Sequence, residues 1–351
     1  MAPPVDALRR ASVGPLVGAE LGEGPLVEDS RATWAANVTL RARLKELMAC
    51  FERASIPVVA LKGWATLARF PGWMPARGTR DVDLLVSPRA FERACEVLVA
   101  EGFTPEVASE PASMWWSGQR EFRASAAGFR VAIDLHRGLH HPPVWRRLSA
   151  AVLERSERVD GVRVPSLPAS LWVIAAHRAR HAWTGDPREW IDAYLIAREL
   201  TPEDAHAWAA GAAALGVDGA SWALWRDVTS WLGTPTPAWD AAASELARGL
   251  SPARTREIEA WREGRRPLPR PLVRLRFIDM YRPLPAMGAS RGSALAGATA
   301  HALLRAVDAL WARDAGVLRT SARAGVVRAP ADPPAGSAHS DDLQPREQHE
   351  R

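Results

Sequence analysis

Two short segments of alternating polar and apolar residues constrain the fold of this chain more than any other feature. The first segment, DVDLLV, begins at Asp81, and the second, FRVAIDLH, ends at His136. Such alternation predicts β-strands that are buried on one face. Because strand side chains alternate between two faces, Asp81 shares a face with Asp83, and Asp134 shares a face with His136. We therefore expect a sheet with one apolar face and one face that carries carboxylates.

Carboxylates that cluster on one face of a sheet repel one another and need a positive partner. A divalent cation can supply this charge, and Mg²⁺ prefers hard oxygen ligands that leave room for water and phosphate. A two-metal site of this kind activates an attacking hydroxyl and stabilises the leaving oxygen in a displacement at phosphorus. Asp81 and Asp83 alone also fit a solvated strand end, because the D-x-D pattern is common. The residues before this pattern favour the cation site.

The segment before the first strand is a short apolar run that leads into Lys62 and Gly63. The run, residues 56–61, has the composition of a buried strand, and residues 64–70 fit a short helix. A glycine at such a turn lets a phosphate approach the backbone, and the N-terminus of a helix favours anions. Only two of the 45 basic residues are lysines, Lys45 and Lys62. As a point charge, Lys62 can pair with a triphosphate.

The remaining pattern divides the chain into an α/β half and a helical half. Residues 1–28 are rich in proline and glycine, which predicts a flexible leader. An α/β core is expected over residues 29–160 and a helical domain over residues 161–328. The polar, proline-rich residues 329–351 predict a disordered tail. The expected helices cover residues 33–53, 89–100, 168–183, 187–200, 202–214, 218–232, 236–249 and 293–319.

Composition excludes several classes of protein. With 47% hydrophobic and 24% charged residues, the chain has the balance of a globular protein. No stretch approaches about 18 uncharged apolar residues, so no transmembrane helix is expected. The two cysteines, Cys50 and Cys95, are too few for a disulfide framework, and a reducing cytoplasm is the expected location.

The positive charge is concentrated late in the chain. Residues 254–282 hold nine arginines against four acidic residues, an excess equal to the net charge of +5 for the whole chain. A non-specific nucleic-acid binder would be basic throughout, so nucleic acid is not the expected partner. The arginine-rich segment fits either a solvated face or a dock for a phosphate-rich partner or membrane surface. The adjacent tryptophans 115–116 fit either plain packing or a surface that binds the acceptor or stacks on a base.

Several motifs together resemble the polymerase-β-like nucleotidyltransferase superfamily, whose signature is a Gly-Ser or Gly-Gly turn, then D-x-[DE], then a third carboxylate on a later strand. More closely, they are similar to a bacterial family of uncharacterised nucleotidyltransferases. The similarity covers approximately residues 35–200. Its motifs are L-K-G at Leu61–Gly63, R-x-x-x-D-V-D-L-L-V at Arg77–Val86, D-L-H at Asp134–His136, H-x-x-x-H-x-W from His177 to Trp183, and W-I-D at Trp190–Asp192.

The resemblance implies an α+β fold, in which a mixed β-sheet flanked by helices is followed by a mostly helical domain. It also implies an enzyme that uses Mg²⁺ to transfer a nucleoside monophosphate from an NTP. The acceptor would be a hydroxyl on an unidentified small molecule, peptide or protein. Members of the bacterial family are sometimes encoded beside genes for peptide natural products, which favours a role in their biosynthesis.

The resemblance also implies roles for individual residues. The carboxylates of Asp81, Asp83 and Asp134 would hold the catalytic Mg²⁺, while Lys62, Gly63 and Arg77 would grip the triphosphate. The chain departs from the superfamily at the turn, where Trp64 stands in place of a serine or second glycine. The superfamily's contact between this turn and the phosphates is therefore altered here.

The pair His177 and His181 lies four residues apart on a predicted helix and so shares one face. This spacing suits Zn²⁺, but no glutamate stands between them in the H-E-x-x-H arrangement and no cysteine cluster is near. Two other interpretations are open. The pair either hydrogen-bonds Asp192 and packs the two halves together, or it contacts the nucleotide or acceptor. His136 is likewise expected either to contact substrate or to support the fold.

Two rival functions differ from the enzyme in class or in acceptor. The first is a non-catalytic module of the same fold that binds nucleotide or regulates a biosynthetic assembly. The intact set of Asp81, Asp83 and Asp134 argues against it, whereas Trp64 argues for it. The second rival is an RNA nucleotidyltransferase, which predicts a continuous basic groove rather than one basic segment.

Overall fold

The computed structural model describes residues 12–79, 81–106, 118–126, 129–139, 145–181, 186–263, 284–300 and 302–304, together with residues 5 and 9. All of them belong to one compact unit that spans residues 1–309. No helix among these residues is long and apolar enough to cross a membrane.

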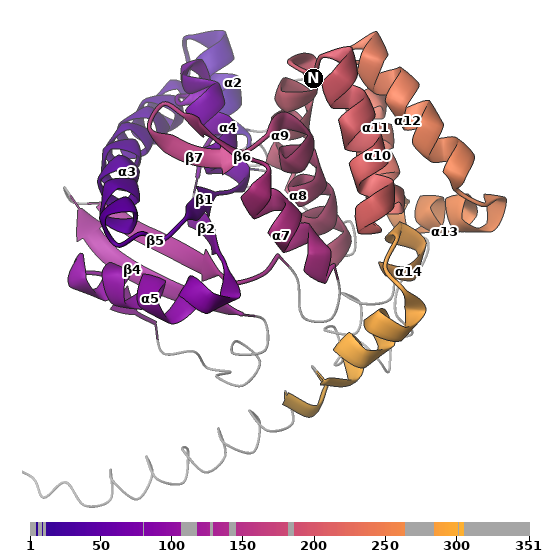
Figure 1. Ribbon diagram of the computed structural model, residues 1–351. Helices are drawn as coiled ribbons and strands as arrows, with labels where there is room; N and C mark the ends of the chain where they lie inside the picture. The colour runs from indigo at the N-terminus through magenta and orange to yellow at the C-terminus, as the bar shows by residue number, and fades with distance from the viewer. Residues whose placement is uncertain are drawn as a thin grey trace, which may run out of the picture. The chain divides into compact units, whose positions relative to one another are not determined.

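The centre of the α/β half is a five-stranded mixed sheet (Figure 1). Strands β2 and β5 run parallel, and the other neighbouring pairs run antiparallel. This arrangement confirms the mixed sheet expected for the α+β fold. In spatial order the strands are β1 (Val58–Ala60), β2 (Val82–Val86), β5 (Phe129–His136), β4 (Gln119–Ala126) and β3 (Thr104–Pro105).

One face of the sheet packs against helices α3 (Val27–Arg53) and α5 (Phe91–Ala100). Alternate residues of β2 and β5, among them Leu84 and Leu135, turn toward these helices and are fully buried. From α3, apolar side chains at helical spacing, including Phe51, fill the same core. This core is the apolar face that the alternating segments predict.

The other face of the sheet is divided between a second core and the polar groups. Helices α7 (Arg146–Glu154) and α8 (Leu167–Arg180) pack against Val59, Leu61 and Leu85. Around the almost fully buried α8, the helices of the C-terminal half form a layer that Figure 1 shows beside the sheet. The helices are α7 (Arg146–Glu154), α8 (Leu167–Arg180), α9 (Arg188–Arg198), α10 (Pro202–Leu215), α11 (Asp218–Leu232), α12 (Pro237–Gly249), α13 (Pro252–Arg262) and α14 (Leu284–Met287).

The helical half follows the predicted boundaries closely because its helices carry local start signals. Thr201 and Thr236 cap α10 and α12 through their hydroxyl oxygens, and each is followed by a proline at the first helical position. Ser251 caps α13 in the same way, although the sequence predicts no helix there. Helix α13 carries the first part of the arginine-rich segment, and residues 264–283 lie outside the described residues.

A β-hairpin that the sequence analysis does not predict follows α7. Strands β6 (Ser156–Val159) and β7 (Val162–Pro165) pair antiparallel across Asp160 and Gly161. Both turn residues have positive φ, the conformation that Asp-Gly turns favour. Lys45 and a neighbouring arginine of α3 form ion pairs with Asp160, which ties the hairpin to the sheet half.

The predicted flexible leader contains a helix, α2 (Gly14–Leu21), and α3 begins at Val27 rather than at residue 33. Gly18 allows the two helices to meet, because a Cβ there would lie 2.0 Å from the carbonyl oxygen of Leu26. Here glycine marks a close approach of two backbones rather than a flexible chain. Residues 115–116 and the predicted tail lie outside the described residues, whereas residues 291–300 and 302–304 of the last predicted helix are helical.

Two short helices complete the α/β half. Helix α4 (Lys62–Arg69) follows β1 directly, and the 3-10 helix η1 (Pro71–Trp73) leads toward β2. A second 3-10 helix, η2 (Pro88–Ala90), precedes α5. Helix α4 packs against α8 and α9, so the residues that open it lie where the sheet meets the helical layer.

Candidate active site

Asp83 and Asp134 stand next to each other on the two parallel strands. Asp83 pairs in register with Asp134, and Leu85 pairs with His136. Residues paired on neighbouring strands project from the same face, so the two carboxylates and the imidazole lie together. The potential ligand atoms of Asp83, Asp134 and His136 all lie within 4.8 Å of one another. Among the described residues, these are the three acidic or histidine side chains that lie close enough together to hold a metal ion.

Asp83 is buried and receives two hydrogen bonds on one oxygen. Lys62 Nζ donates to Oδ1 at 2.8 Å, and His136 Nε2 donates to the same atom at 2.9 Å. Burial opposes ionisation, but the Lys62 ammonium and the His136 imidazole hold the pKa of Asp83 far below its ordinary value. Asp83 is therefore a carboxylate. Its Oδ2 has no hydrogen-bond partner among the described residues.

Asp134 has the opposite electrostatic environment. Burial and the negative charges of Asp83 and Asp81 raise the pKa of Asp134 to about 7. Glu121, directly across on β4, adds to this repulsion. Gln119 Nε2 donates to Asp134 Oδ2 at 2.9 Å, and Oδ1 has no partner within the described part of the chain. The repulsion between the clustered carboxylates therefore destabilises mainly the ionised form of Asp134. A bound cation would relieve this repulsion.

Asp81 lies just before β2 at the mouth of the site. Asp81 as a whole residue is exposed to solvent. Its carboxyl group is nevertheless partly shielded from water. This shielding and the charge of Asp83 raise the pKa of Asp81. Asp81 and Asp83 border the same cavity, as their shared strand face predicts. Asp81 is nevertheless outside the group of three ligand atoms, in which His136 stands instead.

A cavity of about 300 Å³ opens beside these groups, between the sheet half and the helical layer. Its size is at the lower end for small-molecule sites. Both walls are strongly polar, which distinguishes the cavity from an ordinary packing void. The sheet-side wall consists of Leu61, Lys62, Gly63, Trp64, Arg77, Thr79, Asp81 and Asp83, and the helical wall of His177, His181, Asp186, Arg188 and Glu189.

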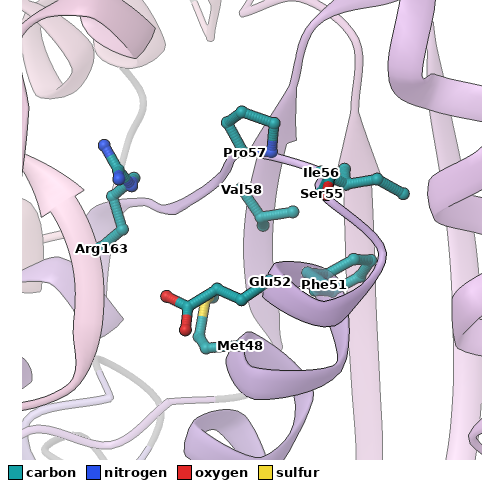
Figure 2. A pocket seen from close by; sticks show the side chains of 8 residues that line it. All are labelled: Met48, Phe51, Glu52, Ser55, Ile56, Pro57, Val58 and Arg163. Atoms are coloured by element: carbon teal, nitrogen blue, oxygen red, sulfur yellow. The ribbon is translucent and has the colours of Figure 1, made fainter.

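A second hollow, of about 330 Å³, lies away from the carboxylates at the end of α3. Figure 2 shows its mostly apolar lining from α3 and β1, with Arg163 of β7 across from them. Glu52 is its single carboxylate. This hollow lacks the clustered groups that phosphate chemistry needs, so the polar cavity is the candidate active site.

Arg77 is committed to a partner in the helical layer. Its Nε donates to Asp192 Oδ1 at 2.9 Å and its Nη2 donates to Asp192 Oδ2 at 2.8 Å. Both side chains are buried. The guanidinium also packs on Gly63, where a Cβ would lie 2.9 Å from Arg77 Nη2. The structure thus places Arg77 and Gly63 at the site, but it uses Arg77 to join the sheet half to α9.

His177 binds Glu189, not Asp192 as one interpretation of the sequence has it. His177 Nδ1 donates to Glu189 Oε1 at 2.5 Å, and the buried Arg178 pairs with the other carboxylate oxygen at 3.4 Å. Burial and the charge of Lys62 lower the pKa of His177, although Glu189 opposes this. The His181 ring lies 4.5 Å from that of His177, and burial with nearby charges lowers its pKa to about 3. Both imidazoles are therefore neutral at pH 7.

Sequence reasoning missed Gln119, Arg188 and Glu189. Arg188 pairs with Asp186 and donates from Nη1 to the carbonyl of Gly78 at 2.5 Å, which links α9 to the loop before β2. Gln119 and Glu189 acquire their positions through strand pairing and helix packing. No local pattern in the sequence marks them, except that Glu189 directly precedes the W-I-D motif.

Comparison with known proteins supports the family. The family model described as uncharacterised nucleotidyltransferase matches residues 7–233. A solution structure of the antibiotic-resistance factor ANT(2'')-Ia matches with a TM-score of 0.32 and 15% identity, over 49% of this chain and 91% of that chain. That likeness is too loose to bear on fold or function. The search among curated proteins found no match. From its matched residues, the chain belongs to the family of uncharacterised nucleotidyltransferases.

Proposed function

We propose that this nucleotidyltransferase uses Mg²⁺ to transfer a nucleoside monophosphate from an NTP to an acceptor hydroxyl on a small molecule, peptide or protein. The pairing of Asp83 with Asp134 on adjacent parallel strands carries the proposal. Each carboxylate keeps one oxygen without a hydrogen-bond partner among the described residues. Two hard oxygen donors beside a polar cavity of ligand size fit an Mg²⁺–nucleotide complex.

In this proposal, Asp83 and Asp134 hold the cation and Asp81 adds a third carboxylate at the mouth of the cavity. When bound, Mg²⁺ supplies positive charge to the phosphates and to the attacking oxygen. His136 keeps Asp83 ionised through its hydrogen bond. On the same wall, Lys62 is within reach of a phosphate, and Gly63 leaves the backbone accessible.

The transfer breaks one bond and forms another at the α-phosphorus. The acceptor oxygen bonds to phosphorus while the bond to the bridging oxygen of pyrophosphate breaks. The hydroxyl proton passes to the Asp134 carboxyl, beside Asp83, and pyrophosphate departs. Because Asp192 already engages Arg77, we assign Arg77 to positioning rather than to the triphosphate.

The helical wall is the proposed side for the acceptor. His177 and His181 face the cavity opposite Lys62 and Asp83. As neutral imidazoles they can accept or donate a hydrogen bond to a hydroxyl substrate without adding charge. A small-molecule or peptide natural product is the acceptor class that the resemblance implies, and we retain it.

An RNA acceptor is less well supported than a small one. The described part of the arginine-rich segment, residues 254–263, contributes nothing to the cavity lining. Arg254 and Arg262 are instead paired with Asp218 and Asp227 within the helical layer. These arginines therefore do not form the extended basic groove that RNA binding needs. Both cysteines are free thiols, and a reducing cytoplasm is the location that we propose.

Calorimetric titration with each NTP, in the presence and absence of Mg²⁺, tests the proposal. We expect at least one NTP to bind in an Mg²⁺-dependent way, with affinity reduced about tenfold or more in Asp83→Asn and Asp134→Asn. Glu121→Gln is the matched control, because Glu121 neighbours Asp134 but lies outside the ligand group. Binding without turnover to pyrophosphate, in the presence of candidate acceptors, would favour the non-catalytic module. Absence of NTP binding would reject the nucleotide site.

A further inference from the structure

Lys62 makes a contact that competes with the proposed cation. Its ammonium lies 2.8 Å from Asp83 Oδ1, and the Asp83 side chain is only 6% exposed. In this buried setting the attraction between the two charges is strong, because little water screens it. A divalent ion bound to Asp83 would bring two further positive charges to the same carboxylate. The ammonium and the cation therefore cannot both hold Asp83 closely.

The backbone of Lys62 is strained at the residue that makes this contact. Its φ of +51° lies in the left-handed region, which is unfavourable for a residue other than glycine. Such strain persists only where the surroundings enforce it, and it is frequent at binding sites. Leu61, just before it, is extended and donates its backbone N–H to the carbonyl of Asp83. The strained residue and Asp83 are thus held together by the backbone as well as by the side chains.

The chemistry of lysine suits an exchange of partners. Its ammonium is a compact charge on a flexible four-carbon stem with three donors, whereas arginine forms planar, fixed pairs. Arginine fills nearly every other basic position in this chain, and Lys62 lines the cavity that a triphosphate would enter. When Asp83 is taken by a cation, the ammonium can pass to an anionic nucleotide that enters this cavity.

We propose that Lys62 is an exchangeable counter-ion, which competes with the divalent cation for Asp83 and passes to the triphosphate when cation and nucleotide bind together. This inference rests on the proposed function. In this inference Lys62 determines when the cation binds. The cation binds weakly by itself and tightly together with its nucleotide. The lysine then prevents the carboxylates from capturing a cation that brings no substrate.

Titration of the full chain with Mn²⁺ alone, followed by the electron paramagnetic resonance of the free ion, tests the competition. Mn²⁺ shares the oxygen-ligand preference of Mg²⁺ and is observable directly. Removal of the competing charge in Lys62→Met should tighten Mn²⁺ binding about tenfold or more. Lys62→Gln should do the same, and Lys62→Arg, which keeps the charge, should stay near wild type. The gain should disappear in the double variant Lys62→Met, Asp83→Asn.

The chain offers a matched control in its other lysine. Lys45 Nζ lies 2.8 Å from Asp160 Oδ1, the same pairing at the same distance, and neither residue lines the cavity. Lys45→Met should leave Mn²⁺ binding unchanged. Circular dichroism of each variant establishes that it is folded before it is titrated.

The outcomes separate this inference from the proposed function. Tighter Mn²⁺ binding in Lys62→Met and Lys62→Gln supports the competition for Asp83, whatever the NTP titrations show. Unchanged or weaker Mn²⁺ binding in both variants overturns it, even if Mg²⁺–NTP binds the wild type. Failure of wild type and both variants to bind Mn²⁺ also overturns it. If the exchange operates, the same variants should bind Mg²⁺–NTP less tightly, because the phosphate partner is lost.

Discussion

Arg77, in the loop before β2, and Asp192, on α9, form a buried pair joined by two parallel hydrogen bonds of 2.9 and 2.8 Å. The pair connects the sheet half, which carries the carboxylates, to the helix whose N-terminal turn supplies Glu189 to the opposite wall of the cavity. This ion pair thus joins the two walls of the candidate active site directly. This relationship makes the pair a test of how the cavity is assembled.

Loss of Asp192 should destabilise the protein strongly. Asp192→Ala leaves the Arg77 guanidinium buried without its partner, which typically costs about 3–5 kcal/mol. The control is Asp218→Ala, since Asp218 forms the same two-bond pair with Arg254 in a more exposed setting. Its loss should cost only about 0.2–1 kcal/mol. Urea denaturation measures both, and equal losses would contradict the special role of the buried pair.

A methyl group at Gly63 should displace the same guanidinium. In Gly63→Ala the new Cβ would lie 2.9 Å from Arg77 Nη2, so the pair with Asp192 must shift. We expect lower thermal stability together with weaker binding of Mg²⁺–NTP. Gly72→Ala is the control, because nothing lies within 4 Å of a Cβ at that position. Should Gly63→Ala match Gly72→Ala in both measurements, the packing of Arg77 on Gly63 is not limiting.

Cation and nucleotide together should raise the melting temperature. A ligand that binds only the folded state stabilises it by about 2.7 kcal/mol at a hundredfold excess over its dissociation constant. Thermal unfolding with Mg²⁺ and NTP should show this shift, and EDTA should abolish it. Asp134→Asn should not respond, because it removes a ligand of the Asp83–Asp134–His136 group. A full response in that variant would place the cation elsewhere.

Stability should decrease on mild acidification. Burial lowers the pKa of His177 in the folded state, and the charge of Lys62 lowers it further. Below about pH 6.5 the unfolded imidazole takes up a proton that the folded one does not. The unfolded state then binds more protons, so the free energy of unfolding falls as the pH drops from 7 toward 5. His136 and His181 act in the same direction, whereas Asp134, whose pKa is raised to about 7, acts against these three imidazoles.

The share of His177 can be measured by substitution. In His177→Gln the slope of unfolding free energy against pH should be shallower, by at most about 1.4 kcal/mol per pH unit. His206→Gln, at an exposed position on α10, should keep the wild-type slope. Urea titrations at pH 5, 6 and 7 give these slopes. An unchanged slope in His177→Gln would mean that folding does not alter the proton uptake of this imidazole.

The sequence by itself determined the elements whose signals are local. The alternation in β2 and β5 predicted a carboxylate face, because side chains alternate on every strand whatever its neighbours. Threonine caps followed by proline marked α10 and α12. The motifs around Asp83 and Asp134 also predicted the family that the match over residues 7–233 confirms.

Local signals failed where glycine and short strands were concerned. The proline and glycine content of residues 1–28 predicts a flexible leader, but Gly18 serves a close contact between α2 and α3. The hairpin of β6 and β7 escaped prediction because each strand has only four residues, too few for a clear alternation. Its Asp160–Gly161 turn was the available signal.

Only the tertiary structure decided which side chains meet. Arg77 and Asp192 are 115 residues apart, and Lys62 and Asp83 are 21 apart. No periodicity in the sequence specifies such pairs, because they arise from strand order and from the packing of α4 and α9. The sequence could name the charged groups of the site, but burial and proximity set their pKa values and partners. The physical reason is that charge interactions depend on distance and hydration, which a chain acquires only when it folds.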